Sequence, residues 1–323
     1  MHVTKAVITA AARGVRLYPA VDSVQYAMFP LVDRDGIAKP VIQIIAEEAL
    51  DSGIEDVCIV CTPGDEAQYL HHFRVLRESL LAFSGIAWAQ QQAERLDTLL
   101  NCLHFAVQTE PLGYGHAVSC AREFTAGAPF LLLLGDHLYL STRRGQRCAE
   151  QLLAFAQQEA CAVSAVRATH ESLIGNYGTL TGQHAANQPG VYRIERLLEK
   201  PSVSIAELSL MTPGLRAGFY LCFFGMHVLT PSIFEQLDVL MAASPVGDIA
   251  LTPALQALAE RERYLALELS GVRYDIGRKF GMLRAQIPFA LAGDDREAML
   301  TTLVELMAET QQAQLLGNTD GST

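Results

Sequence analysis

The sequence has few basic residues for its size. Its 323 residues include 24 lysines and arginines against 35 aspartates and glutamates, which gives a formal net charge of −11. A protein that binds nucleic acid generally needs a basic surface to displace counterions. We therefore expect no nucleic-acid partner. A small anionic ligand stays open, because a few cations can gather at one site of an acidic protein.

The sequence also lacks an apolar run long enough to cross a membrane. Its densest apolar stretch, residues 129–135, is far shorter than the roughly 20 residues that a spanning helix needs. The apolar stretch at residues 6–12 is followed by Arg13 and Arg16, so we interpret residues 5–12 as a buried strand and not as a signal peptide. We expect no membrane partner.

The sequence has seven cysteines, an odd number, and most of them lie in apolar runs. This pattern favours buried, reduced thiols over a disulfide framework and predicts a cytoplasmic protein. Cys58 and Cys61 have the spacing of a metal or redox pair, but they lie inside the strand-like residues 57–61 with no second pair nearby. We interpret both as core residues.

Hydrophobic residues make up 50% of the chain, which is enough for a large core and excludes global disorder. The length suggests about two domains or one large one. Because no repeat and no linker rich in proline or serine divides the chain, we expect one continuous body at residues 1–311. It would comprise a first half (1–140), a second half (141–278) and C-terminal helices (279–311). Residues 312–323 show no periodicity, and we expect a flexible tail.

The apolar periodicity predicts strands that alternate with helices. In the first half we expect strands at residues 5–11, 56–61, 130–134 and 160–167, and helices at 39–52, 116–124 and 145–158. In the second half we expect strands at 191–198, 219–224 and 264–269, a polar hairpin or loop at 182–190, and helices at 249–262 and 279–310. Repeated strand–helix units indicate an α/β fold with a mostly parallel central sheet flanked by helices.

The segment directly after the first strand is the first candidate site. Ala10 and Ala11 lead into a turn that contains Arg13, Gly14 and Arg16. Exposed backbone N–H groups and arginines in such a turn can hold phosphate. An ordinary loop with surface arginines is the alternative.

A second candidate combines Gln108 with a glycine pair, Gly113 and Gly115, just before a predicted helix. Glycines let the backbone approach a ligand closely. A plain helix start is the alternative.

Two carboxylates follow strands or turns. Asp136 comes after the strand at residues 130–134, and Asp275 lies in a turn before a helix. In open α/β sheets, ligands bind at the carboxyl ends of strands, and carboxylate oxygens suit Mg²⁺. A turn or helix cap is the alternative. His116 and His137 lack the spacing of a metal motif, so we do not expect them to be ligands.

Taken in order, these segments resemble the sugar-phosphate nucleotidylyltransferases, and most closely the bacterial UTP–glucose-1-phosphate uridylyltransferases. The resemblance covers about residues 5–283. The segments that carry it are Lys5–Ile8, Arg16–Ala20, Met28–Asp33, Lys39–Pro40, Glu110–Val118, Leu134–Asp136, Tyr177–Gly178, Glu199–Pro201, Gly225–Leu229, Gly247–Thr252 and Tyr274–Gly277.

The resemblance implies a Rossmann-like nucleotide-diphospho-sugar transferase fold and a reaction. An oxygen of glucose-1-phosphate would attack the α-phosphorus of UTP, and pyrophosphate would leave. Mg²⁺ would be the cofactor, held by Asp136 and Asp275, and Arg16 would be the catalytic phosphate donor. Implied nucleotide contacts are Ala10, Ala11, Arg13, Gly14, Gln108 and Gly113, and implied sugar-phosphate contacts are Gly178, Glu199, Lys200 and Gly225. A thymidine nucleotide stays an alternative to uridine.

The sequence departs from the family pattern on the triphosphate side. The family loop Gly-x-Gly-Thr-Arg is Ala12-Arg-Gly-Val-Arg16 here, Tyr26 and Ala27 replace a lysine and a glutamate, and Asp22 aligns with an earlier lysine. A neutral phenol does not replace an ammonium that faces a triphosphate, and loss of one electrostatic donor lowers rates by on the order of 10²–10³. This supports two hypotheses: an enzyme of reduced rate, or a non-catalytic sugar-nucleotide-binding or regulatory protein on the same fold.

Two further features bear on the outside of the molecule. Residues 32–40 contain an insertion relative to the family, and we expect it to be a surface loop. The predicted helix at residues 279–310 is apolar on more than one face. Packing on its own domain and self-association into a homo-oligomer are the two interpretations.

Overall fold

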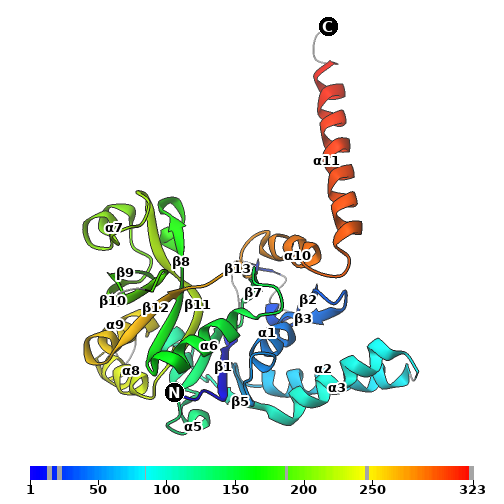
Figure 1. Cartoon of the computed structure of the whole chain (residues 1–323). Coiled ribbons are helices and arrows are strands. Elements are labelled where there is room, and N and C mark those ends of the chain that lie inside the picture. The colour runs from blue at the N-terminus through cyan, green and yellow to red at the C-terminus, as the bar shows by residue number, and fades with distance from the viewer. Residues whose placement is uncertain (13–16, 20–23, 84, 186–187, 244–246, 320–323) are drawn as a thin grey trace.

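A nine-stranded mixed sheet runs through the centre of the molecule, with helices on both faces (Figure 1). The structure is a computed structural model, and we describe residues 1–12, 17–19, 24–83, 85–185, 188–243 and 247–319, with side chains up to residue 311. The strand order is β5-β4-β1-β6-β11-β8-β12-β10-β9. The bounds are β1 Lys5–Thr9, β4 Asp56–Cys61, β5 Leu103–Val107, β6 Phe130–Leu134, β8 Ala162–His170, β9 Thr179–His184, β10 Val191–Leu198, β11 Phe219–Leu229 and β12 Tyr264–Glu268.

Parallel pairing is confined to part of this sheet. The strands β5, β4, β1 and β6 are parallel to one another, as are β8 and β12. Strand β11 is antiparallel to β6 and β8, and β9 and β10 form the predicted antiparallel hairpin around residues 182–190. The predicted α/β class is confirmed, but the sheet is mixed beyond β6, since β11 lies antiparallel between β6 and β8 and β10 is antiparallel to β12.

Both faces of the sheet are buried. On β1, Ala6 and Ile8 point into one apolar cluster and Val7 points into the other. The continuous apolar run of β6 has the same cause, since Leu131 and Leu133 face the first cluster and Leu132 the second. Strands covered on two sides lose the polar alternation of a half-exposed sheet.

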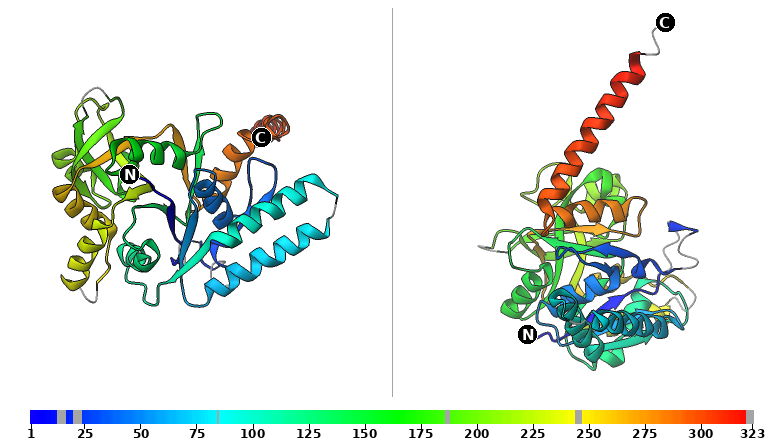
Figure 2. Two further views of the ribbon diagram at one scale, coloured as in Figure 1. Left: turned by 60° about the horizontal axis from the view of Figure 1, so that its bottom comes forward. Right: turned by 90° about the vertical axis from the view of Figure 1, so that its right-hand side faces the viewer.

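The helices cover these faces or extend from them. Their bounds are α1 Val41–Leu50, α2 Asp65–Ala82, α3 Ala87–Cys102, α4 Tyr114–Ser119, α5 Arg122–Thr125, α6 Cys148–Glu159, α7 Val203–Ser209, α8 Ser232–Ala243, α9 Leu251–Arg261, α10 Gly281–Leu291 and α11 Arg296–Thr319, with 3₁₀ turns η3 Tyr26–Met28 and η4 Glu171–Asn176. The long helices α2 and α3 lie side by side (Figure 2). Neither helix was predicted from the sequence, and α2 buries only a few apolar side chains along its length, among them Tyr69, Phe73 and Leu80.

The C-terminal region differs from the predicted single helix at residues 279–310. It breaks between α10 and α11 because Gly293 packs on the backbone of Arg34, and the N–H of Asp294 donates to the Arg34 carbonyl at 3.0 Å. Helix α11 then projects from the body and continues to Thr319 (Figure 1). The helix thus extends into the residues where we expected a flexible tail, and the glutamines, alanine and leucines there favour helix even without periodicity.

The insertion at residues 32–40 is more than a surface loop. It forms a hairpin of β2 (Pro30–Val32) and β3 (Ala38–Pro40), and the Gln286 side chain hydrogen-bonds the backbone N–H and carbonyl of Val32 at 3.0 Å each. Lys39, at the end of the insertion, is only 2% exposed. The expectation of a simple exposed loop was therefore incomplete, since the insertion carries a buried charge and docks on α10.

The cysteines match the sequence interpretation. All seven are free thiols, and five of them are buried. Burial raises the pKa of Cys58 and of Cys61, both in β4, to about 12, so neither forms a thiolate readily. Among the described residues, no helix is both long and apolar enough to span a bilayer.

Candidate functional site

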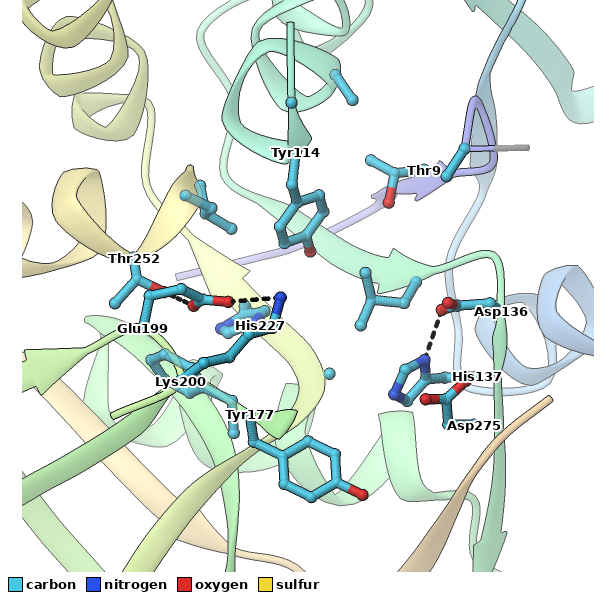
Figure 3. Close-up of a pocket in the computed structure, with 18 of the residues that line it drawn as sticks. Thr9, Tyr114, Asp136, His137, Tyr177, Glu199, Lys200, His227, Thr252 and Asp275 are labelled. Atoms are coloured by element: carbon cyan, nitrogen blue, oxygen red, sulfur yellow. Dashed lines mark hydrogen bonds and ion pairs between the residues drawn. The ribbon is translucent and has the colours of Figure 1, made fainter. Parts of the chain in front are cut away.

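A cavity of about 450 Å³ opens at the carboxyl ends of the parallel strands β1 and β6 (Figure 3). This is the edge at which α/β sheets bind ligands. Nine of the residues predicted to form the site line it: Ala11, Gln108, Gly113, Asp136, Gly178, Glu199, Lys200, Gly225 and Asp275. Residues as far apart in sequence as 11 and 275 thus meet in one space.

The structure describes only some of the predicted nucleotide-binding residues. Ala10 is fully buried and does not line the cavity, and its N–H donates to the Val60 carbonyl at 2.7 Å. This donor is thus used at the end of β1, and a direct contact of Ala10 with the nucleotide stays a prediction. Arg13, Gly14 and Arg16 lie outside the described residues, as does Asp22.

Gln108 is buried and its amide is held in one orientation. Its Nε2 donates to the Gly113 carbonyl at 3.1 Å and contacts His116 Nδ1 at 3.0 Å. These two contacts use the amide nitrogen, so the side-chain oxygen Oε1 is the group that remains for a ligand. His116 therefore helps to orient Gln108.

Contacts within the protein, and not only a ligand, require the two glycines Gly113 and Gly115. Gly113 has a φ of +98°, and a Cβ placed there would lie 1.9 Å from Asp248 Oδ1 and 2.9 Å from the backbone of Ile249. Gly115 donates its N–H to the Ile249 carbonyl at 2.6 Å. The backbone that approaches these glycines closely is therefore the chain's own segment before α9, and this contact closes one wall of the cavity.

We expect Gly113→Ala to lower the free energy of unfolding by about 2 kcal/mol or more, since it combines backbone strain with a clash. Urea unfolding would measure the change. The matched control is Gly127→Ala, where φ is +76° but nothing lies within 4 Å of the added methyl group, so only the strain of about 1 kcal/mol remains. Equal losses in both variants would contradict the close contact.

The two predicted metal-binding carboxylates meet on one side of the cavity. Antiparallel pairing of β7 (His137–Ser141) with β13 (Gly271–Asp275) places Asp275 opposite His137, and the Ile276 N–H donates to the Asp136 carbonyl at 2.9 Å. One ligand atom each of Asp136, His137 and Asp275 lies within 4.8 Å of the others. His137 Nδ1 is 2.6 Å from Asp136 Oδ1, so this histidine orients a carboxylate.

The sugar side contains a carboxylate held by two partners. Glu199 Oε2 accepts a hydrogen bond from the Thr252 hydroxyl at 2.5 Å, and Glu199 Oε1 lies 3.2 Å from Lys200 Nζ. Gly225 has a φ of +84° and lies within β11, where the pairing with β8 shifts register. A Cβ at this position would lie 3.3 Å from the His137 side chain and 2.9 Å from that of Leu134. The arrangement leaves a polar wall opposite the metal-binding side (Figure 3).

Tyr26, the residue in place of the family lysine, lies on the cavity wall and is 2% exposed. Burial raises the pKa of its phenol, and the charges of Asp136 and Asp275 raise it further. The side chain is therefore neutral and supplies no cation here. Its neighbour Ala27 is fully buried in the core, and Ala12 is exposed at the cavity edge. Val15 lies outside the described residues.

Tyr177, Thr252 and His227 are polar lining residues to which the sequence alone gave no role. Tyr177 and His227 lie one and two positions from the predicted site residues Gly178 and Gly225, and Thr252 ends the segment at residues 247–252 that carries the family resemblance. Only the fold shows which member of each segment faces the cavity.

The fold and the cavity together define a class: an α/β protein with a nucleotide-type site at the carboxyl edge of its parallel strands and two carboxylates beside it. The model of the nucleotidyl transferase family matches residues 5–287, and the chain belongs to this family.

Named relatives agree with this assignment. The chain is 31% identical to a UTP–glucose-1-phosphate uridylyltransferase of Bacillus subtilis over 304 residues, which covers 94% of this chain and 96% of that protein. It is 33% identical to one of Streptococcus pneumoniae over 292 residues, covering 90% and 91%. The fold is similar to a UDP-glucose pyrophosphorylase solved with UDP-glucose, at a TM-score of 0.72 and 25% identity over 89% of this chain and 98% of that one. It is also similar to the UDP-glucose pyrophosphorylase of Acinetobacter baumannii, at a TM-score of 0.76 over 94% and 99% of the two chains.

Proposed function

We propose that this protein binds UTP and glucose-1-phosphate and forms UDP-glucose at a reduced rate. The observation that carries the proposal is that nine of the predicted nucleotide, metal and sugar residues line one cavity. The 31–33% identity to uridylyltransferases over most of the chain supports the substrate class.

The residues on the two sides of the cavity would bind different parts of the substrates. Gln108 Oε1 would accept from the N3–H of the base, a donor that uracil and thymine share, so a thymidine nucleotide stays the alternative. Glu199 and Lys200 would orient the sugar hydroxyls and the sugar phosphate. The attacking phosphate oxygen of glucose-1-phosphate and the α-phosphorus of UTP are then held in line, and pyrophosphate leaves.

The carboxylates fit a divalent metal. Asp136 and Asp275 offer hard oxygen ligands close together, which suits Mg²⁺ better than a soft metal. When bound, the ion would neutralise charge that develops on the phosphates. Asp136 and Asp275 would hold it.

Tyr26 supports the second part of the proposal, the reduced rate. A buried neutral phenol beside the two carboxylates gives no electrostatic help to a triphosphate. The same observation favours the alternative function, a binding or regulatory protein that keeps the sugar nucleotide and does not turn over.

Two measurements separate these functions. Release of pyrophosphate from UTP and glucose-1-phosphate with Mg²⁺ reports catalysis, and calorimetry with UDP-glucose reports binding. Slow release together with binding supports the proposal, and binding without any release supports the regulatory alternative. Absence of both contradicts the substrate assignment.

We expect Asp136→Asn to weaken metal binding by about tenfold or more, because it removes one of two anionic oxygen ligands. Titration with Mn²⁺ in the presence of UTP, followed by electron paramagnetic resonance, measures this affinity without requiring turnover. Glu235→Gln, an exposed acid on α8, is the charge-matched control and should bind Mn²⁺ as the native chain does. Unchanged affinity in Asp136→Asn would remove Asp136 from the metal site.

A further inference from the structure

His227 is a cavity residue for which the reaction outlined above gives no role. It lies on β11, two positions after Gly225, is 3% exposed and lines the cavity. In Figure 3 it lies on the side of Glu199 and Thr252, across from Asp136. The ring packs edge-on against Phe223 with centroids 5.0 Å apart, and Leu251 and Leu255 of α9 line the same cavity.

Two buried hydroxyls, those of Ser164 and Tyr264, fix the direction of one nitrogen of this imidazole. His227 Nδ1 is 2.5 Å from the Ser164 hydroxyl, and the Ser164 hydroxyl also contacts the Tyr264 hydroxyl. All three side chains are buried. The ring therefore turns Nδ1 inward, and Nε2 is the nitrogen on the cavity side.

The protons shared by Tyr264, Ser164 and His227 have one consistent arrangement. Burial raises the pKa of Tyr264, so its hydroxyl keeps its proton and must donate it. The acceptor that the described residues offer is Ser164 Oγ, and Ser164 then has its own proton to donate to His227 Nδ1. Burial also lowers the pKa of His227 to about 3, so the ring is neutral near pH 7. A neutral imidazole that accepts at Nδ1 carries its proton on Nε2.

We propose that His227 donates a hydrogen bond from Nε2 to an oxygen of the bound sugar, and that Tyr264 and Ser164 position it by fixing the tautomer. This inference rests on the proposed function, since it places a sugar in this part of the cavity. It assigns sugar recognition to a residue on the sheet itself, in addition to Glu199 and Lys200 at the turn after β10. A donor whose direction is fixed in this way selects ligands with an acceptor oxygen at that point.

The tautomer is tested on the free protein. A ¹⁵N–¹H correlation spectrum of the histidine side chains at pH 7, assigned with His227→Gln, is expected to show the His227 proton on Nε2. In Ser164→Ala, which leaves the imidazole in place but removes its partner, the fixed preference should be lost. A proton on Nδ1 in the native chain would overturn the inference.

The contact with the sugar is tested by calorimetry with UDP-glucose. We expect His227→Phe to weaken binding by about tenfold, the effect of one buried hydrogen bond, and His227→Gln, which can donate from its own Nε2, to recover most of it. Because a purely structural role would not be rescued by glutamine, this pair separates the two explanations. Unchanged affinity in His227→Phe overturns the inference alone. Absence of UDP-glucose binding in the native chain overturns the proposed function and, with it, the sugar contact, whatever the spectrum shows.

Discussion

Replacing Tyr26 by lysine is expected to raise the rate of pyrophosphate release by on the order of 10²–10³, the effect of one preorganised electrostatic donor. The side chain at this position lines the cavity beside Asp136 and Asp275, whose charges act on it. A lysine ammonium would be stabilised by these carboxylates and would face the triphosphate. The measurement is a coupled pyrophosphate assay with saturating UTP and glucose-1-phosphate.

The control for this change is Tyr26→Phe, which removes the hydroxyl and keeps the ring, and which should not raise the rate. Ala27 should be left unchanged, because it is fully buried and a glutamate there would place a carboxylate in the core. The explanation by Tyr26 would be wrong if the native chain turned over at an ordinary rate of about 1–10³ s⁻¹. It would also be wrong if a folded Tyr26→Lys variant were no faster than Tyr26→Phe.

Lys39→Met is expected to lower the free energy of unfolding by about 3–5 kcal/mol, because it leaves buried carboxylates without their cation. Lys39 Nζ lies 3.1 Å from Asp33 Oδ2, 2.6 Å from Asp35 Oδ2 and 3.0 Å from Glu47 Oε2, and Asp33 and Glu47 are themselves buried. Burial alone would lower the pKa of Lys39, but Glu47, Asp33 and Asp35 raise it on balance. The ammonium is therefore charged at pH 7, and its contribution to stability is lost only as the pH rises through this raised pKa.

Urea unfolding at pH 7 measures the effect of Lys39→Met. Arg77→Met is the matched control, since Arg77 pairs with Asp97 where both side chains are partly exposed, at 34% and 43%. Solvent screens a pair as exposed as this one, so this variant should stay close to the native stability. A loss of less than about 1 kcal/mol in Lys39→Met would contradict this role of Lys39. It would indicate that Arg95, which also contacts Glu47, is enough to stabilise the buried carboxylates.

The sequence predicted the fold class and most of the site because both depend on local patterns. The strands around β1 and β6 are continuous apolar runs, and the residues that follow such strands lie at one edge of the sheet. Asp136 was found in this way and Asp275 from a turn before a predicted helix, together with the family motifs, and both line one cavity.

The remaining features depend on contacts between distant segments, which no local pattern records. Gly113 is required by the segment at residues 248–249, and Lys39 is buried by carboxylates of its own hairpin and of α1. The direction of His227 depends on Ser164 of β8, the neighbouring strand of the sheet. Ala10 lies directly after the first predicted strand, where an N–H could bind phosphate, but its N–H donates to the Val60 carbonyl of the neighbouring strand.

The projecting part of helix α11 is expected to be less stable than the central sheet. From Val304 to Gln311 every residue is exposed, and Val304, Leu306 and Met307 are 65%, 53% and 70% exposed. In the single chain this part of the helix gains nothing from tertiary packing, and an unsupported helix of this length is marginal in water. Its amides therefore exchange with solvent through local opening, whereas those of β1 and β6 exchange only when the whole sheet unfolds.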